Sequence, residues 1–215
     1  GEMDAGPKPS EVAIVPKTFW EKLQNIWFHD GKVIIVAVLF VALAIFLCVQ
    51  CMNKPKYDLQ VVYYTYTYAL DENVNGMEKY FNKYAKDING DGEVNVNVIN
   101  CSYTNSSAAH NIKTTYETRL QATVTAEANA LLYITDADSY KHFSDVFGDK
   151  FFDGEPILLS EEFYKSASIE GYEGLPENLT ISLRKTSDTM IEMDKNTEKY
   201  KKESLRILKS ISKTD

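Results

Sequence analysis

The chain has 215 residues, of which 44% are hydrophobic, and a formal net charge of −8 at pH 7. This acidic balance disfavours nucleic acid as a partner, because nucleic-acid binding requires a basic surface that displaces counterions, and it also disfavours adhesion to anionic lipid. Of the three cysteines, only Cys101 lies outside the apolar stretch at 33–52, so the polar part of the chain has no second thiol for an internal disulfide.

The apolar stretch at 33–52 predicts a transmembrane helix. It contains no charged residue, and at about 1.5 Å per residue its length matches the roughly 30 Å hydrocarbon core of a bilayer. A cleaved signal peptide is disfavoured, because the run is long and no small-x-small site follows it. Lipidation at Cys48 or Cys51 is disfavoured, because no small residue directly precedes either of them. The chain therefore divides into a tail (1–32), one span (33–52) and a polar domain (53–215).

The tail carries the pattern of a short amphipathic helix. Thr18 and Glu21 have the spacing of a capping box. Apolar residues follow at helical steps, with tryptophans suited to the headgroup layer: Phe19, Trp20, Leu23, Ile26 and Trp27. We expect this helix to lie in the membrane interface, and the alternative is docking to another membrane protein. Three lysines flank the span on the tail side and two on the domain side, which favours a cytoplasmic tail and an extracellular domain at the cell membrane.

Segments with strand and helix patterns alternate through the polar domain. A β-branched and aromatic run predicts a first strand at 59–68, with apolar residues on both faces, as in a central strand covered on both sides. Strands separated by helices indicate an α/β fold with a mostly parallel sheet of about four to five strands and helices on both faces. Further strands are predicted at 94–98, 130–135 and 179–184, helices at 74–84, 112–129, 140–147 and 197–211, and a helical turn at 161–164 in the glycine- and proline-rich segment 148–178.

The most specific local motif is the acidic loop at 87–95. Oxygen-bearing side chains stand at the positions of an EF-hand-type calcium loop, and Gly92 occupies the tight turn; the loop is especially similar to the dockerin version. Position 12 is Val98, where that family has an acidic ligand, and a predicted strand follows in place of a helix. The alternatives are a calcium site and a polar helix-to-strand turn. The candidate calcium ligands are Asp87, Asn89, Asp91, Glu93 and Asn95.

Polar side chains follow three predicted strands, at the sheet edge where ligands collect in an open α/β fold. Asp136 and Asp138 directly follow the third strand, and the loops after the first two strands carry Tyr68, Tyr103 and Asn105. Together these residues predict a polar ligand-binding pocket with tyrosine walls. Asp136 is alternatively the N-cap of the next helix. The sequence contains no nucleophile elbow, P-loop or glycine-rich dinucleotide turn, so no catalytic activity is expected. A metal-dependent hydrolase using Asp136 and Asp138 is the alternative.

Residues 58–147 resemble the first lobe of bacterial extracellular solute-binding proteins, the receptors of ABC importers. The similar segments are LQVVYY at 59–64, FNKY at 81–84, the valine-rich strand at 94–98, YETRLQA at 116–122 and LLYITDAD at 131–138. The resemblance implies a single solute-binding-protein-like lobe, without the second lobe that closes around a solute.

The tail and the apolar stretch, from FWEKL at 19–23 to KPKYD at 54–58, are similar to small uncharacterised single-pass proteins of Gram-positive bacteria of the clostridial type. That similarity implies a tail inside the cell and a domain outside. We therefore expect a membrane-anchored extracellular binding domain at the cell envelope, which takes a small ligand or a partner protein. The alternative is a structural accessory subunit of a membrane transport or envelope complex, which makes its contacts through the tail helix and the span.

Overall fold

The computed structural model describes residues 18–52, 56–104, 110–172, 174–187 and 189–213. The chain divides into two compact units, Gly1–Pro55 and Lys56–Asp215.

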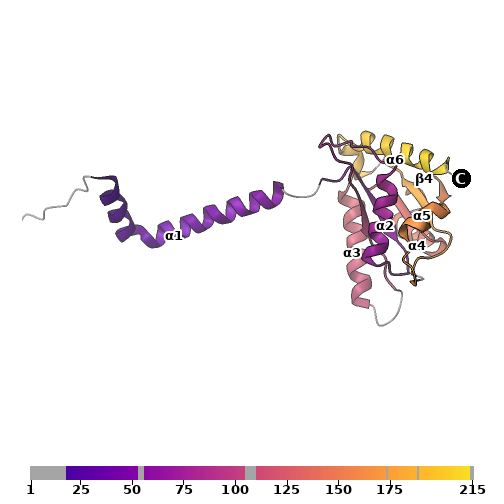
Figure 1. The fold of residues 1–215 in the computed structure, drawn as a ribbon, viewed down its shortest axis with the longest axis horizontal. Helices are drawn as coiled ribbons and strands as arrows, with labels where there is room; N and C mark the ends of the chain where they lie inside the picture. The colour runs from indigo at the N-terminus through magenta and orange to yellow at the C-terminus, as the bar shows by residue number, and fades with distance from the viewer. Residues whose placement is uncertain (1–17, 53–55, 105–109, 173, 188, 214–215) are drawn as a thin grey trace, which may run out of the picture. The chain divides into compact units, whose positions relative to one another are not determined.

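The described part of the first unit is a single helix, α1 (Phe19–Met52), shown in Figure 1. The predicted interfacial helix and the predicted span are thus one continuous helix. Its start is the predicted capping box, in which the Glu21 N–H donates to Thr18 Oγ1 and the Thr18 N–H donates to Glu21 Oε2, each at 3.3 Å. The segment Gly31–Met52 is long and apolar enough to cross a membrane, and none of it is buried. A signal sequence has the same length and composition.

The second unit is an α/β domain built on a five-stranded sheet in the order β2-β1-β3-β5-β4. β1 pairs in parallel with β2 on one side and with β3 on the other. All six residues of β1 are buried, which confirms the prediction of a central strand covered on both sides. The strands are β1 (Leu59–Tyr64), β2 (Val96–Asn100), β3 (Leu132–Thr135), β4 (Phe152–Leu158) and β5 (Thr180–Arg184).

The sheet is mixed, so the prediction of a mostly parallel sheet is wrong. β5 lies between β3 and β4 and runs antiparallel to both. The reason lies in the connection between β4 and β5. Its two ends meet at one end of the sheet, where Leu158 pairs with Thr180 and the Leu159 N–H donates to the Leu179 carbonyl at 2.9 Å. The chain therefore re-enters the sheet where it left, and β5 must run back along β4.

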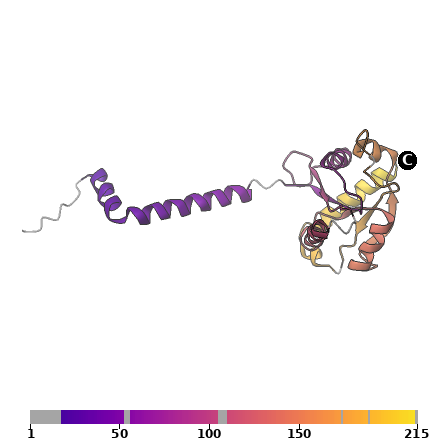
Figure 2. The same cartoon turned by 90° about the horizontal axis from the view of Figure 1, so that it is seen from below.

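Helices cover both faces of the sheet, as predicted. Side chains alternate along β1, so that Val61 and Tyr63 join one core cluster while Val62 and Tyr64 join the other. The first cluster is completed by α2 (Asp71–Asn82), α5 (Glu161–Ala167) and α6 (Thr197–Ser212), and the second by α3 (His110–Ala126) and α4 (Ala137–Phe147). Figure 2 shows α2 and α3 end-on, on opposite sides of the strands.

Both edge strands of the sheet are protected. On β2, the N–H groups of Val96 and Val98 donate to side chains of α2, namely Asn82 Oδ1 at 2.9 Å and Glu78 Oε1 at 3.0 Å. On β4, the pairing register shifts between Asp153 and Ile157, and the strand contains Gly154 and a proline at position 156. Irregular, proline-containing edges and occupied N–H groups resist pairing with a further strand.

Candidate functional site

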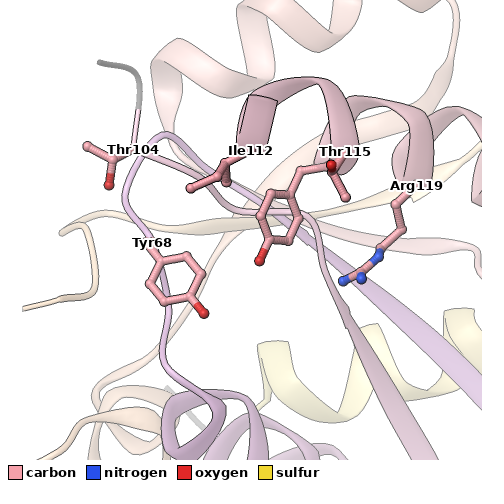
Figure 3. A pocket seen from close by; sticks show the side chains of 6 residues that line it. Tyr68, Thr104, Ile112, Thr115 and Arg119 are labelled. Carbon is pink, nitrogen blue, oxygen red and sulfur yellow. The ribbon is translucent and has the colours of Figure 1, made fainter. Parts of the chain in front are cut away.

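An open groove of about 390 Å³ lies beside the N-terminal half of α3. Figure 3 shows Tyr68, from the loop after β1, facing the side chains that α3 presents to the groove. Thr104, which follows β2, closes one end. The lining side chains are those of Tyr68, Thr104, Ile112, Thr115, Tyr116 and Arg119. The groove thus lies where the segments after the first two strands meet α3.

The guanidinium group of Arg119 is held in place at this groove. Its Nη1 donates to the Asn100 carbonyl, at the end of β2, at 3.0 Å. Its central carbon lies 5.2 Å from the centre of the Tyr116 ring, a cation–π arrangement that orients the plane of the group. Arg119 is exposed, and a guanidinium has five N–H donors, so donors remain for a ligand.

Two tyrosine rings form the apolar wall of the groove. Tyr68 and Tyr116 are half-buried and meet edge-on, with ring centres 6.5 Å apart. The neighbouring Tyr116 raises the pKa of Tyr68, so its hydroxyl stays neutral at physiological pH. The Tyr172 hydroxyl donates to the Tyr68 carbonyl at 3.2 Å and fixes the loop that carries this ring. The wall is therefore neutral, aromatic and anchored at both sides.

Of the residues predicted to form a ligand-binding pocket, Tyr68 lines this groove, whereas the lining residues of α3 were not predicted. The stripe of Ile112, Tyr116, Leu120 and Val124 predicts the helix at 112–129 and no part of the pocket. Only the second half of that stripe is core: Leu120 and Val124 are buried, whereas Ile112 is 52% exposed and Tyr116 half-buried. Tyr116 packs against the second core cluster, and it lines the groove together with Ile112. The spacing is the same along the whole stripe, so the sequence carries no signal that separates its groove residues from its core residues.

Tyr103 does not line the groove. It is fully buried, and its hydroxyl donates to Glu117 Oε1 at 2.8 Å. The Tyr64 hydroxyl donates to the same oxygen at 2.9 Å. Burial raises the pKa of both tyrosines. Tyr103 thus belongs to the second core cluster, and Asn105 lies outside the described residues.

Asp136 and Asp138 are not brought to the groove either. Asp136 is the N-cap of α4, as in the alternative interpretation, and its Oδ1 accepts from the Ser139 N–H at 2.7 Å. Asp138 is exposed in the first turn of that helix. Within the ranges that the structure describes, no three His, Cys, Asp or Glu side chains converge as a metal-binding group. The two aspartates have the local role expected at the start of a helix.

The 87–95 loop is closed by its own hydrogen bonds. The two carboxylate oxygens of Asp87 accept from the N–H groups of Gly90 and Gly92, at 2.6 and 2.9 Å. These donors, Gly92 first, lower the pKa of Asp87. Asn89 Oδ1 accepts from the Asp91 N–H, and Asp91 Oδ1 accepts from the Glu93 N–H. The candidate ligands therefore fold the loop as a series of side-chain-to-backbone turns.

A buried carboxylate outside the loop, that of Asp58, holds it to the domain. Asp58 Oδ1 accepts from the N–H groups of Ile88 and Asn89, at 2.8 and 3.1 Å, and Oδ2 accepts from the Asn95 N–H at 2.8 Å. The Asp58 N–H in turn donates to the Asn95 carbonyl at 2.9 Å. Asp58 is fully buried. The loop is thus anchored at both ends by one residue just before β1.

Calcium binding by the loop remains a prediction, and we expect it to be weak. Val98, at position 12, is buried in β2, so no carboxylate completes the set, and the positive charge of Lys199 acts on Asp87. Calcium titration of the full chain by calorimetry should give a dissociation constant of about 10⁻⁴–10⁻³ M. Asp91→Ala should abolish the signal, and Asp153→Ala, an exposed acid on β4, should keep it. An absence of heat at saturating calcium would leave the loop as a turn.

Comparison with known proteins gave no match: no protein family, no curated protein and no solved structure matches this chain.

Proposed function

We propose that the chain is a single-pass membrane protein with a cytoplasmic tail and an extracellular, non-catalytic binding domain, and that the groove beside α3 is its binding site. The observation that supports a binding site is the preset guanidinium of Arg119 beside two tyrosine rings in an open groove. Tyrosine and arginine are the residue types that contribute most to recognition surfaces. The tail-inside orientation rests on the lysine balance around the span.

The chemistry of the groove suits a ligand with an anionic group next to a flat or apolar part. Arg119 would pair with a carboxylate or phosphate, for which the planar guanidinium is the natural partner. Tyr68, Tyr116 and Ile112 would cover the flat or apolar part. Thr115 Oγ1 donates to the Asn111 carbonyl at 3.1 Å, so its oxygen is left as an acceptor. A small organic acid and a peptide segment with a free or side-chain carboxylate both have this character.

The test is a binding screen on the full chain in detergent. Panels of organic acids, acidic sugars and peptides with free carboxyl ends are compared by thermal shift and by nuclear magnetic resonance. A ligand of the groove should bind at least about tenfold more weakly to Arg119→Ala and to Tyr116→Ala. Arg119→Lys should recover little of the loss, because an ammonium group lacks the planar fork.

Thr118→Ala is the matched control, since Thr118 is exposed on the same helix but does not line the groove. A ligand whose affinity changes equally in Thr118→Ala and Arg119→Ala does not use this groove. If no member of the panels binds, or if every ligand found is indifferent to Arg119 and Tyr116, the proposal is wrong.

A structural accessory subunit is the second candidate, and exposed aromatic rings on α1 favour it. Phe19, Trp20 and Trp27 are each at least 60% exposed. Such rings suit either the headgroup layer or another membrane protein. In this case Trp20→Ala/Trp27→Ala would release a co-purifying membrane partner that Arg119→Ala retains. The reverse pattern would support the groove.

A further inference from the structure

A second groove, of about 470 Å³, lies between α6 and the segment that follows α2. Five cationic side chains line it: Lys86, Lys199, Lys202, Arg206 and Lys209. We call it the basic groove. The formal net charge of the whole chain is −8, so a local basic surface lies on a chain that is acidic overall.

The acidic residue within the basic groove is already engaged. Glu203 is buried, and its carboxylate accepts from the Lys86 N–H at 3.0 Å and from Arg206 Nε at 2.9 Å. Arg206 also donates to the Tyr84 carbonyl. These hydrogen bonds join α6 to the segment after α2, and they pair the negative charge of Glu203 with Arg206. Glu203 and Arg206 therefore form the floor of the groove, and the charge of Glu203 does not neutralise the lysines at the rim.

The four lysines at the rim are exposed. Within the described residues, none of them forms an ion pair. The Asp87 carboxylate, which interacts electrostatically with Lys199, already accepts two N–H groups of its own loop. Four exposed ammonium groups on one groove repel one another, and an anionic surface would relieve that repulsion.

Apolar side chains lie among these lysines. Leu205 is 37% exposed, and Ile88 is half-buried in the lining. Lysines that surround exposed aliphatic groups are typical of surfaces that lie on the headgroup layer of a membrane. A free phosphate or a nucleic acid would use the lysines but gain nothing from Leu205.

Chain connectivity also relates the basic groove to a bilayer. The loop that borders it is bound to the first residues of the domain, because Asn89 Nδ2 donates to the Lys56 carbonyl at 3.4 Å and Asp58 holds the loop from beneath. Lys56 is four residues along the chain from Met52, the last residue of α1. Lys56, where the described part of the domain begins, therefore lies beside this loop.

We propose that the basic groove binds the headgroups of anionic phospholipids, in the same bilayer that α1 enters. The lysines would pair with lipid phosphates, and Leu205 would lie among the upper acyl carbons. This role is separate from the groove beside α3, and it reverses the expectation from net charge that the domain avoids anionic lipid. It would hold the domain against the membrane in addition to the covalent link.

The test is lysine accessibility on the full chain in nanodiscs. Discs of phosphatidylcholine alone are compared with discs that also contain phosphatidylglycerol, and an amine-acylating reagent is read out by mass spectrometry. Labelling of Lys199, Lys202 and Lys209 should fall about fivefold or more in the anionic discs. Lys141 and Lys165, on α4 and α5, should not change. High salt should restore labelling, because it screens exposed charges.

Two variants of equal charge separate a specific groove from a general charge effect. Lys199→Gln/Lys202→Gln/Lys209→Gln should remove the protection of the remaining Lys86, whereas Lys141→Gln/Lys150→Gln/Lys165→Gln should retain it. Equal labelling in both kinds of disc would overturn the proposal, as would loss of protection in both variants. Protection by inorganic phosphate in neutral discs, to the extent seen with phosphatidylglycerol, would assign the groove to a free anion and overturn the lipid assignment.

Discussion

Replacing Gly76 by alanine is expected to destabilise the domain by about 2–3 kcal/mol, although the same change inside an exposed helix normally stabilises it by about 1 kcal/mol. Gly76 lies in α2, where that helix meets α5. A Cβ at this position would lie 2.1 Å from the Ser166 carbonyl oxygen and 2.9 Å from Ala167 Cα. These atoms belong to backbone, so α5 as a whole would have to move.

The displacement would also break the hydrogen bonds that join the two helices. Asn73 Nδ2 donates to the Ala167 carbonyl at 2.8 Å, and Ser166 Oγ donates to the Gly76 carbonyl at 2.7 Å.

Urea unfolding of the full chain, followed by circular dichroism, measures the loss of unfolding free energy in Gly76→Ala. Tryptophan fluorescence is unsuitable, because both tryptophans lie in α1. Asn75→Ala, at an exposed position on the same helix, is the control and should be neutral or slightly stabilising. Wild-type stability in Gly76→Ala would contradict the close packing of α2 and α5.

Replacing Asp58 by alanine should cost about 3–4 kcal/mol of unfolding free energy. The change removes the acceptor of three backbone N–H groups, those of Ile88, Asn89 and Asn95. Asp58 is fully buried, so water cannot readily replace the carboxylate. Asp58→Asn should lie between wild type and Asp58→Ala, because the amide keeps one accepting oxygen and turns an NH₂ group toward a remaining donor.

The matched control for Asp58 is Asp91→Ala, since Asp91 is an exposed aspartate of the loop with one backbone donor, the Glu93 N–H. It should cost no more than about 0.5 kcal/mol. Hydrogen exchange of the amides at 88–95 gives a second measure, and these amides should exchange faster in Asp58→Ala than in Asp91→Ala. Equal effects of the two changes would mean that the loop is held mainly by its own turns.

Local patterns in the sequence predicted most of the elements of the domain. The run at 59–64 has apolar residues on both faces because β1 is buried on both, and this pattern identifies a central strand. β4 was missed, because its sequence, FDGEPIL, is an irregular edge in which Gly154 and the following proline interrupt the alternation of a strand. A strand that is paired on one side and largely exposed needs no apolar face, and its sequence carries little signal.

The direction of β5 and the wall of the candidate site depend on the fold as a whole. The sequence of β5 alternates as any half-buried strand would, and only the return of the chain at Leu159 and Leu179 makes it antiparallel. In the same way, Ile112 and Tyr116 have the same helical spacing as the buried Leu120 and Val124, and only the fold shows that they line a groove. Residue types and their spacing indicate which side chains can be buried, whereas the packing of neighbouring elements decides which side chains are buried.

The occupied edge of β2 has a consequence for how copies of the chain behave together. Proteins carried by an apolar helix are confined to a plane, where encounters between identical domains are far more frequent than at the same amount in free solution. An open strand edge in that setting would recruit the sheet of the next copy and grow into a filament. Asn82 and Glu78 already occupy the amides that would start such growth. In the membrane-anchored arrangement that we propose, crowding would therefore raise the local number of domains without polymerising them.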